Sequence, residues 1–175
     1  PLPSTTLNLR FISAVADEDD RPGAFGFTQT LHLPVDIKPE LLPILLLATF
    51  TAMECKDNEK AAKLREGLNM ALEEAMPILQ SLPADLTTRE RTAIQFCAGK
   101  AIAKVAQMQA SLDLYQSAAK FLIEALAGIE QEDAPFAWAT AQMNLGMVLQ
   151  ALIEKGDTEM MDHVVESFRS ALKHL

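Results

Sequence analysis

Apolar and polar residues alternate singly near the start of the chain. Residues 7–11 have the order Leu-Asn-Leu-Arg-Phe, and a similar alternation returns between residues 25 and 37. An acidic run followed by Pro22 and Gly23 separates the two stretches. Because alternation on both sides of a polar Pro-Gly turn is typical of a β-hairpin, the pattern predicts a hairpin-like arm over residues 1–38, called the N-terminal arm below. An irregular extended arm lying over the same helices remains the alternative.

From Pro39 onward the apolar residues recur every three or four positions, which indicates amphipathic helices. Threonines at 87 and 88 and a proline at 135 are start signals for two of them. The predicted helices span residues 40–55, 58–80, 88–109, 112–130 and 135–153, and a sixth follows the break at residues 156–158. The fold class is therefore mainly α, with a helical repeat domain over residues 39–175 made of hairpins at about 40–80, 88–130 and 135–175.

The last two predicted hairpins carry similar residues at similar places. Gln95, Gly99 and Ile102 recur as Gln142, Gly146 and Leu149, 47 residues later (95 to 142). Leu122, Ala125 and Leu126 recur as Phe168, Ala171 and Leu172, 46 residues later (122 to 168). A fainter copy lies 50 residues before residue 122, in the 58–80 helix. Matching small and large residues on both helices of a hairpin are typical of stacked repeats.

The segment Trp138–Gly146, with the sequence WATAQMNLG, resembles the first helix of a tetratricopeptide repeat, particularly the bacterial pattern W-A-x-x-Q-x-N-L-G. The resemblance implies a tetratricopeptide-like α-solenoid in which a Leu-Gly pair lets the two helices of a hairpin approach closely. The middle hairpin keeps Ala98-Gly99, with Ala118, Leu122 and Ala125 on the second helix. The family repeat has about 34 residues, whereas the spacing in this chain is 46 to 50 residues.

The resemblance also implies a binding surface, because the first helices of tetratricopeptide arrays line the concave face. By position, the partner-binding set is Phe96, Cys97, Lys100, Lys104, Thr140, Met143, Asn144 and Met147. Aromatic and methionine side chains would supply apolar contact, Asn144 could hold a peptide backbone, and the two lysines could hold a carboxylate. Alternatively, both lysines only solvate a helix face. The family's carboxylate clamp matches at Asn144 alone, so a chaperone-tail receptor is not expected.

The charge of the chain narrows the range of partners. It has 15 Lys and Arg against 24 Asp and Glu, a net charge of -9, which argues against nucleic acid and against an anionic membrane. Residues 88–130 alone have a positive balance, with 5 basic and 4 acidic groups. Cys55 and Cys97 are isolated in apolar helical pattern, which suggests small buried hydrophobes in a reducing, cytoplasmic compartment.

Candidate chemistry is sparse. The histidines, His32, His163 and His174, are not placed beside either cysteine, and neither a G-x-S-x-G motif nor a phosphate-binding glycine loop occurs. Glu159, His163 and Glu166 share one helical face, as metal ligands do, but they form one imperfect cluster, and a solvated face with an (i, i+4) pair is the favoured interpretation. We therefore expect neither catalysis nor a metal or other cofactor.

These observations together predict a non-catalytic protein–protein interaction module or scaffold that binds a protein or peptide partner in a concave helical groove. One alternative is a structural module that self-associates into a homo-oligomer, since a short stack gains buried core by extension. A helical metal-dependent enzyme is the third hypothesis.

Overall fold

The computed structural model of the protein describes residues 6–11, 29–34, 39–53, 58–132, 134–156 and 169. The secondary-structure elements in chain order are β1 (Thr6–Phe11), β2 (Gln29–Pro34), a 3-10 turn at Pro39–Leu41, α1 (Leu42–Ala52), α2 (Asn58–Gln80), α3 (Thr88–Gln109), α4 (Leu112–Ala127) and α5 (Pro135–Glu154). The prediction of a mainly α-helical chain is confirmed. The predicted sixth helix, and the turn between the two alternating stretches of the N-terminal arm, lie outside the described residues.

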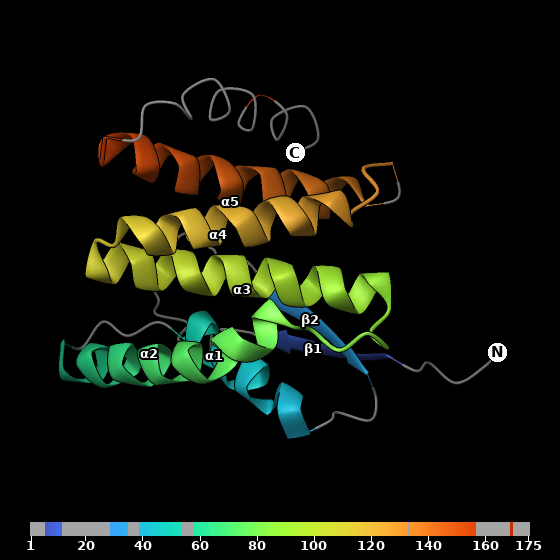
Figure 1. Cartoon of the computed structure of the whole chain (residues 1–175), viewed down its shortest axis with the longest axis horizontal. Coiled ribbons are helices and arrows are strands. Elements are labelled where there is room, and N and C mark those ends of the chain that lie inside the picture. Colours follow the sequence, from blue (N-terminus) through green and yellow to red (C-terminus); the bar gives the residue numbers. More distant parts are fainter. Residues whose placement is uncertain are drawn as a thin grey trace, which may run out of the picture.

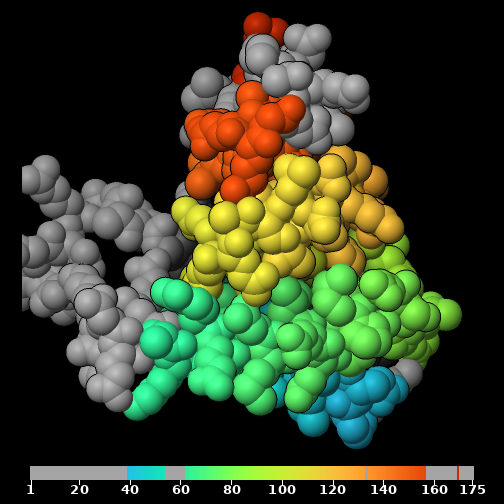
Figure 2. All heavy atoms as spheres, turned by 60° about the vertical axis from the view of Figure 1, so that its left-hand side comes forward, coloured from blue at the N-terminus to red at the C-terminus, as the bar shows by residue number. Residues whose placement is uncertain are grey.

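The helices stack in the order of the sequence. Helices α3, α4 and α5 lie side by side and run in alternating directions, while α1 and α2 lie on the opposite side of α3 from α4 (Figure 1). Figure 2 shows the same order from another side, with α5 in orange-red above α4 in yellow and α2 and α3 in green. Helix α3 contacts α1, α2, α4, α5 and β2, so it is the central element of the described part.

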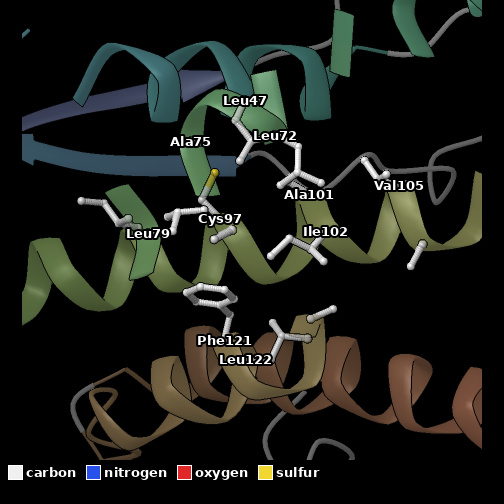
Figure 3. Close-up of a cluster of buried hydrophobic side chains, with 14 of the residues drawn as sticks. Leu47, Leu72, Ala75, Leu79, Cys97, Ala101, Ile102, Val105, Phe121 and Leu122 are labelled. Atoms are coloured by element: carbon white, nitrogen blue, oxygen red, sulfur yellow. The ribbon is translucent and has the colours of Figure 1, made fainter. Parts of the chain in front are cut away.

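The two strands pair antiparallel, with Thr6 opposite Pro34 and Phe11 opposite Gln29. Strand β2 also lies against α3, the central helix. Figures 1 and 3 both show the strands passing between α1 and α3. A two-stranded sheet is marginal alone in water, so its contact with the helices supports the pair.

Local signals set the bounds of the helices. Helices α2 and α3 begin and end at the predicted residues. Thr87 starts α3 with a capping box: its hydroxyl accepts a hydrogen bond from the backbone N–H of Glu90 at 3.2 Å, and the Glu90 carboxylate accepts one from the Thr87 N–H at 2.9 Å. Helix α4 ends at Ala127 rather than at the predicted Glu130, because the N–H of Gly128 turns back to the carbonyls of the last turn.

One continuous apolar core joins α1 to α5. Its buried side chains come from every layer, and Figure 3 labels ten of them: Leu47 of α1; Leu72, Ala75 and Leu79 of α2; Cys97, Ala101, Ile102 and Val105 of α3; and Phe121 and Leu122 of α4. Burial of Cys97, which is 1% exposed, confirms the interpretation of this thiol as a small core hydrophobe.

Helices α3 and α4 approach each other closely at Gly99. A Cβ at this position would lie 2.7 Å from Cγ of Leu122 and 3.2 Å from its backbone nitrogen. The backbone atom cannot move aside without shifting α4, so the crossing needs a residue without a side chain.

We predict that Gly99→Ala destabilises the protein by about 1–3 kcal/mol, because overpacking outweighs the roughly 1 kcal/mol that alanine adds to helix propensity. Urea denaturation measures the change. Gly67→Ala is the matched control, since a Cβ there meets only the ring edge of Phe50, with the nearest atom at 2.9 Å. That ring can turn, so the control should change stability by less than about 1 kcal/mol. Equal effects of the two substitutions would contradict the assignment.

Candidate functional site

The predicted partner-binding residues lie on α3 and α5, which contact each other. On α3 the predicted residues differ in burial: Phe96, Lys100 and Lys104 are half-buried, whereas Cys97 is buried in the core. Gln95 faces α4, where its amide donates a 2.9 Å hydrogen bond to the Glu124 carboxylate. Gln109 faces α2 and bonds Asn69 at 3.3 Å. Phe96 follows Gln95 on α3, and its ring is half-buried.

On α5 the predicted residues form an exposed apolar row. Phe136, Thr140, Met143 and Met147 recur at spacings of four, three and four residues and therefore share one face; we call them the α5 stripe. Phe136 is 69% exposed and Met147 is 57% exposed, whereas Thr140 and Met143 are half-buried. The opposite face of the helix is buried, with Ala139, Ala141, Leu145, Val148, Leu149 and Leu152 in the core.

Phe136 is the member of this stripe that sequence reasoning missed. The predicted set was chosen from positions that match between the two first helices, α3 and α5. The α3 position that matches Phe136, 47 residues earlier, is Arg89, which is charged and exposed, so the pair did not indicate an apolar contact. Helical spacing alone would have found Phe136, because it lies one turn before Thr140.

The polar side chains of α5 bond to their own helix. The hydroxyl of Thr140 donates to the carbonyl of Phe136 at 2.7 Å, and the amide of Asn144 donates to the carbonyl of Thr140 at 2.7 Å. Both bonds reach back four residues, a common arrangement for short polar side chains within helices. The expected role of Asn144, holding a partner's backbone, remains a prediction.

Lys104 binds the end of α1. Its ammonium donates to the backbone carbonyls of Thr51 and Met53, both at 2.9 Å. Those carbonyls belong to the last turn of a helix, which carries partial negative charge and favours a cation. The sequence suggested that Lys104 binds a partner's carboxylate or only solvates a helix face. Neither hypothesis included this bond, which joins α1 to α3.

Lys100 lies one turn before Lys104 but has a different environment. Its ammonium sits 5.7 Å from the centroid of the Phe96 ring, within the range of a cation–π contact. Burial lowers the pKa of this ammonium, the negative thiolate form of Cys97 opposes the shift, and the charge of Lys104 adds to it. A partly desolvated cation beside an apolar ring is suited to an anionic or carbonyl group of a partner.

Cys97 is only 1% exposed, so the prediction of this side chain as a partner-binding residue is wrong. Successive residues of a helix are about 100° apart, and this rotation turns Cys97 away from Phe96 toward the buried side that holds Ala101. The α5 residue that matches Cys97, 47 residues later, is Asn144. It is half-buried, so the two matched positions differ in burial.

The metal candidates Glu159, His163 and Glu166 lie outside the described residues. Within the part of the chain that the structure describes, no three His, Cys, Asp or Glu side chains are grouped to hold a metal ion. Across the same residues, no helix is both long and apolar enough to cross a membrane.

Comparison with known proteins returned no match: no protein-family model fits the chain, and no curated protein or solved structure is similar to it.

We predict that Lys104→Met destabilises the protein by about 1–2 kcal/mol, because two carbonyls at the end of α1 lose their donor. Thermal unfolding measures the loss, and amide hydrogen exchange should show faster opening in α1 than in α4. Lys120→Met, which changes an exposed lysine of α4, is the control and should be nearly neutral. Similar losses in both variants would show that the contact contributes nothing.

We predict the opposite sign for Lys100→Met, which should raise the free energy of unfolding at neutral pH because it removes a charge that burial disfavours. The folded protein holds this proton less tightly than the unfolded chain does. Wild-type stability should therefore rise relative to the variant as the pH increases through the lowered pKa toward the usual lysine range. Denaturation curves from pH 7 to pH 10 measure the difference. A gap that stays constant with pH would contradict this prediction.

Proposed function

We propose that the protein is a non-catalytic interaction module of tetratricopeptide-like helical hairpins, and that it binds a segment of a partner protein along α3 and α5. The observation that carries the proposal is the exposure of the α5 stripe. Phe136, at 69%, is the most exposed of the large hydrophobic side chains in the described residues. Exposed apolar side chains in one row, rather than scattered singly, are typical of a binding surface.

The packing pattern supports the stacked-hairpin part of the proposal. Helices α1 and α2 pack together, as do α3 and α4, and α3 also contacts both helices of the first pair. Helix α5 in turn packs on α4 and touches α3. Contacts between first helices, together with contacts from each second helix to the next first helix, are those that a solenoid of hairpins makes with its neighbours.

The stripe can supply useful binding energy. Burying one Phe or Met side chain stabilises a complex by about 1.5–3 kcal/mol before the cost of association. The Lys100 ammonium on α3 can then orient a polar group of the partner. The acidic balance of the chain supports a protein partner over nucleic acid or an anionic membrane.

Self-association is the second candidate. Leu42 and Leu46 are 48% and 47% exposed and lie one turn apart on α1, so a second apolar spot exists far from the α5 stripe. A homo-oligomer would cover it, with the paired strands of the N-terminal arm extending the contact. Light scattering of the full chain, and of a chain without residues 1–38, tests this alternative, because a monomer in both cases excludes it.

We predict that Met147→Glu weakens partner binding at least tenfold, because it places a charge within the apolar stripe. A displayed library of random peptides, selected on the wild-type protein, provides the ligands, and fluorescence polarisation measures their affinity. Met70→Glu is the matched control, since Met70 is also 57% exposed but lies on α2. Its affinities should equal those of the wild type, and circular dichroism should show both variants folded. A library without any binder that depends on Met147 would remove the proposed site.

A further inference from the structure

Helix α1 carries an exposed apolar face of its own, at the end of the described stack opposite to α5 (Figures 1 and 2). Leu42 is 48% exposed, Leu46 is 47% exposed and Met53 is 45% exposed, whereas the other side of the helix is buried in the core. Together with the half-buried Thr49, these residues recur at spacings of four, three and four and therefore share one side of the helix. We call Leu42, Leu46, Thr49 and Met53 the α1 row.

The whole of α1 lacks charge. From Leu41 to Met53 the chain has no Asp, Glu, Lys or Arg, and its only polar side chains are Thr49 and Thr51. Both hydroxyls donate to carbonyls of their own helix, at 2.8 Å and 2.6 Å. A helix that is apolar on every side is normally covered on every side. The α1 row stays exposed in a single chain, which indicates a contact with a second molecule.

The two ends of the α1 row carry opposite charges. Before the row, the 3-10 turn Pro39–Leu41 contains Glu40, which is exposed. After it, the Lys104 ammonium binds the carbonyls of Thr51 and Met53. An uncharged row with an acid at one end and a base at the other is complementary to a second copy of itself in the antiparallel direction, because each Glu40 then approaches the Lys104 of the other copy. A parallel pair would bring like charges together.

We infer that two copies of the protein associate through the α1 row, with their α1 helices antiparallel about a two-fold axis. The axis passes between Leu46 and Thr49, so Leu42 of each copy faces Met53 of the other. This inference goes beyond the partner site on α3 and α5, and it gives the self-association considered above a face and a direction. The α5 stripe belongs to the opposite end of the stack, so a dimer formed through α1 leaves it open (Figure 1).

The size of the surface sets the strength of the dimer. From Leu42 to Met53 is eleven residues along a helix that rises 1.5 Å per residue, a span of roughly 16 Å. A contact between two helices of this length is smaller than the roughly 800 Å² per partner of a standard interface. We therefore expect a dimer that dissociates in the micromolar range. The uncharged row keeps the contact itself free of repulsion, although each copy has a net charge of -9.

The first test is the mass of the full chain, measured by sedimentation equilibrium from about 1 to 500 µM, over which the wild type should pass from monomer to dimer. Leu46→Lys places a charge in the middle of the row and should raise the dimer dissociation constant about tenfold or more. Ile123→Lys is the matched control, since Ile123 is 54% exposed but lies on α4. It should dimerise like the wild type, and circular dichroism should show both variants folded.

Crosslinking with a short bismaleimide tests the direction of pairing. The variants Leu42→Cys and Met53→Cys are each made together with Cys55→Ser, which leaves the buried Cys97 as the one native thiol. Cys55→Ser alone gives the background. In an antiparallel pair a mixture of the two variants should crosslink about fivefold more than either variant alone, because residue 42 faces residue 53 of the other copy. In a parallel pair each variant would crosslink with itself.

A monomer at every concentration overturns the inference, and the α1 row would then belong to a contact with a different protein. A dimer that Leu46→Lys does not weaken also overturns it, as does crosslinking of either variant with itself to the extent of the mixture. None of these outcomes removes the proposed partner site, which Met147→Glu tests separately.

Discussion

The close packing of α3 on α4 at Gly99 is the contact on which the rest of the described structure depends. With no side chain at this crossing, Leu122 fits directly against the α3 backbone, and this brings the two helices together along their length. Helix α3 can then present its other sides to α1, α2 and β2. A bulkier residue would separate α3 from α4 and would shift α5, which packs on α4, relative to the first helical pair. The relative position of the two halves of the candidate site thus depends on this glycine.

The same packing explains why the two halves of the site differ in exposure. Helix α3 lies in the centre and contacts α1, α2, α4, α5 and β2, and its predicted site residue Phe96 is half-buried. Helix α5 packs on α4 and only touches α3, and it keeps a longer exposed row. Under the proposed function, the apolar contact would therefore come mainly from α5, and α3 would contribute a cation. Such a division suits a ligand that lies along one helix and reaches toward the next.

The helical part of the fold could be predicted from the sequence because its determinants are local. The capping box at Thr87 and Glu90 and the spacing of apolar residues lie within a few positions of the bounds that they set, and α2 and α3 begin and end where these signals place them. Met143 and Met147 were instead proposed as site residues by position, from the resemblance to tetratricopeptide repeats. The hydrogen bonds of Lys104 could not be predicted, since their acceptors are backbone carbonyls 51 and 53 residues away along the chain. For the same reason, the pattern that predicted an extended arm did not indicate that β2 would lie along α3.

Lys100 and Lys104 lie one helical turn apart on α3, but their side chains have different surroundings. Lys104 is directed toward the end of α1, where the helix dipole and two carbonyls favour its charge. Lys100 lies over Phe96, in a place that burial makes unfavourable for a cation, and the neighbouring charge of Lys104 adds to this effect. A charge kept where it costs stability is understandable if a ligand uses it. Because Lys104 is held by α1, Lys100 is the lysine of α3 that the proposed function assigns to orienting a bound segment.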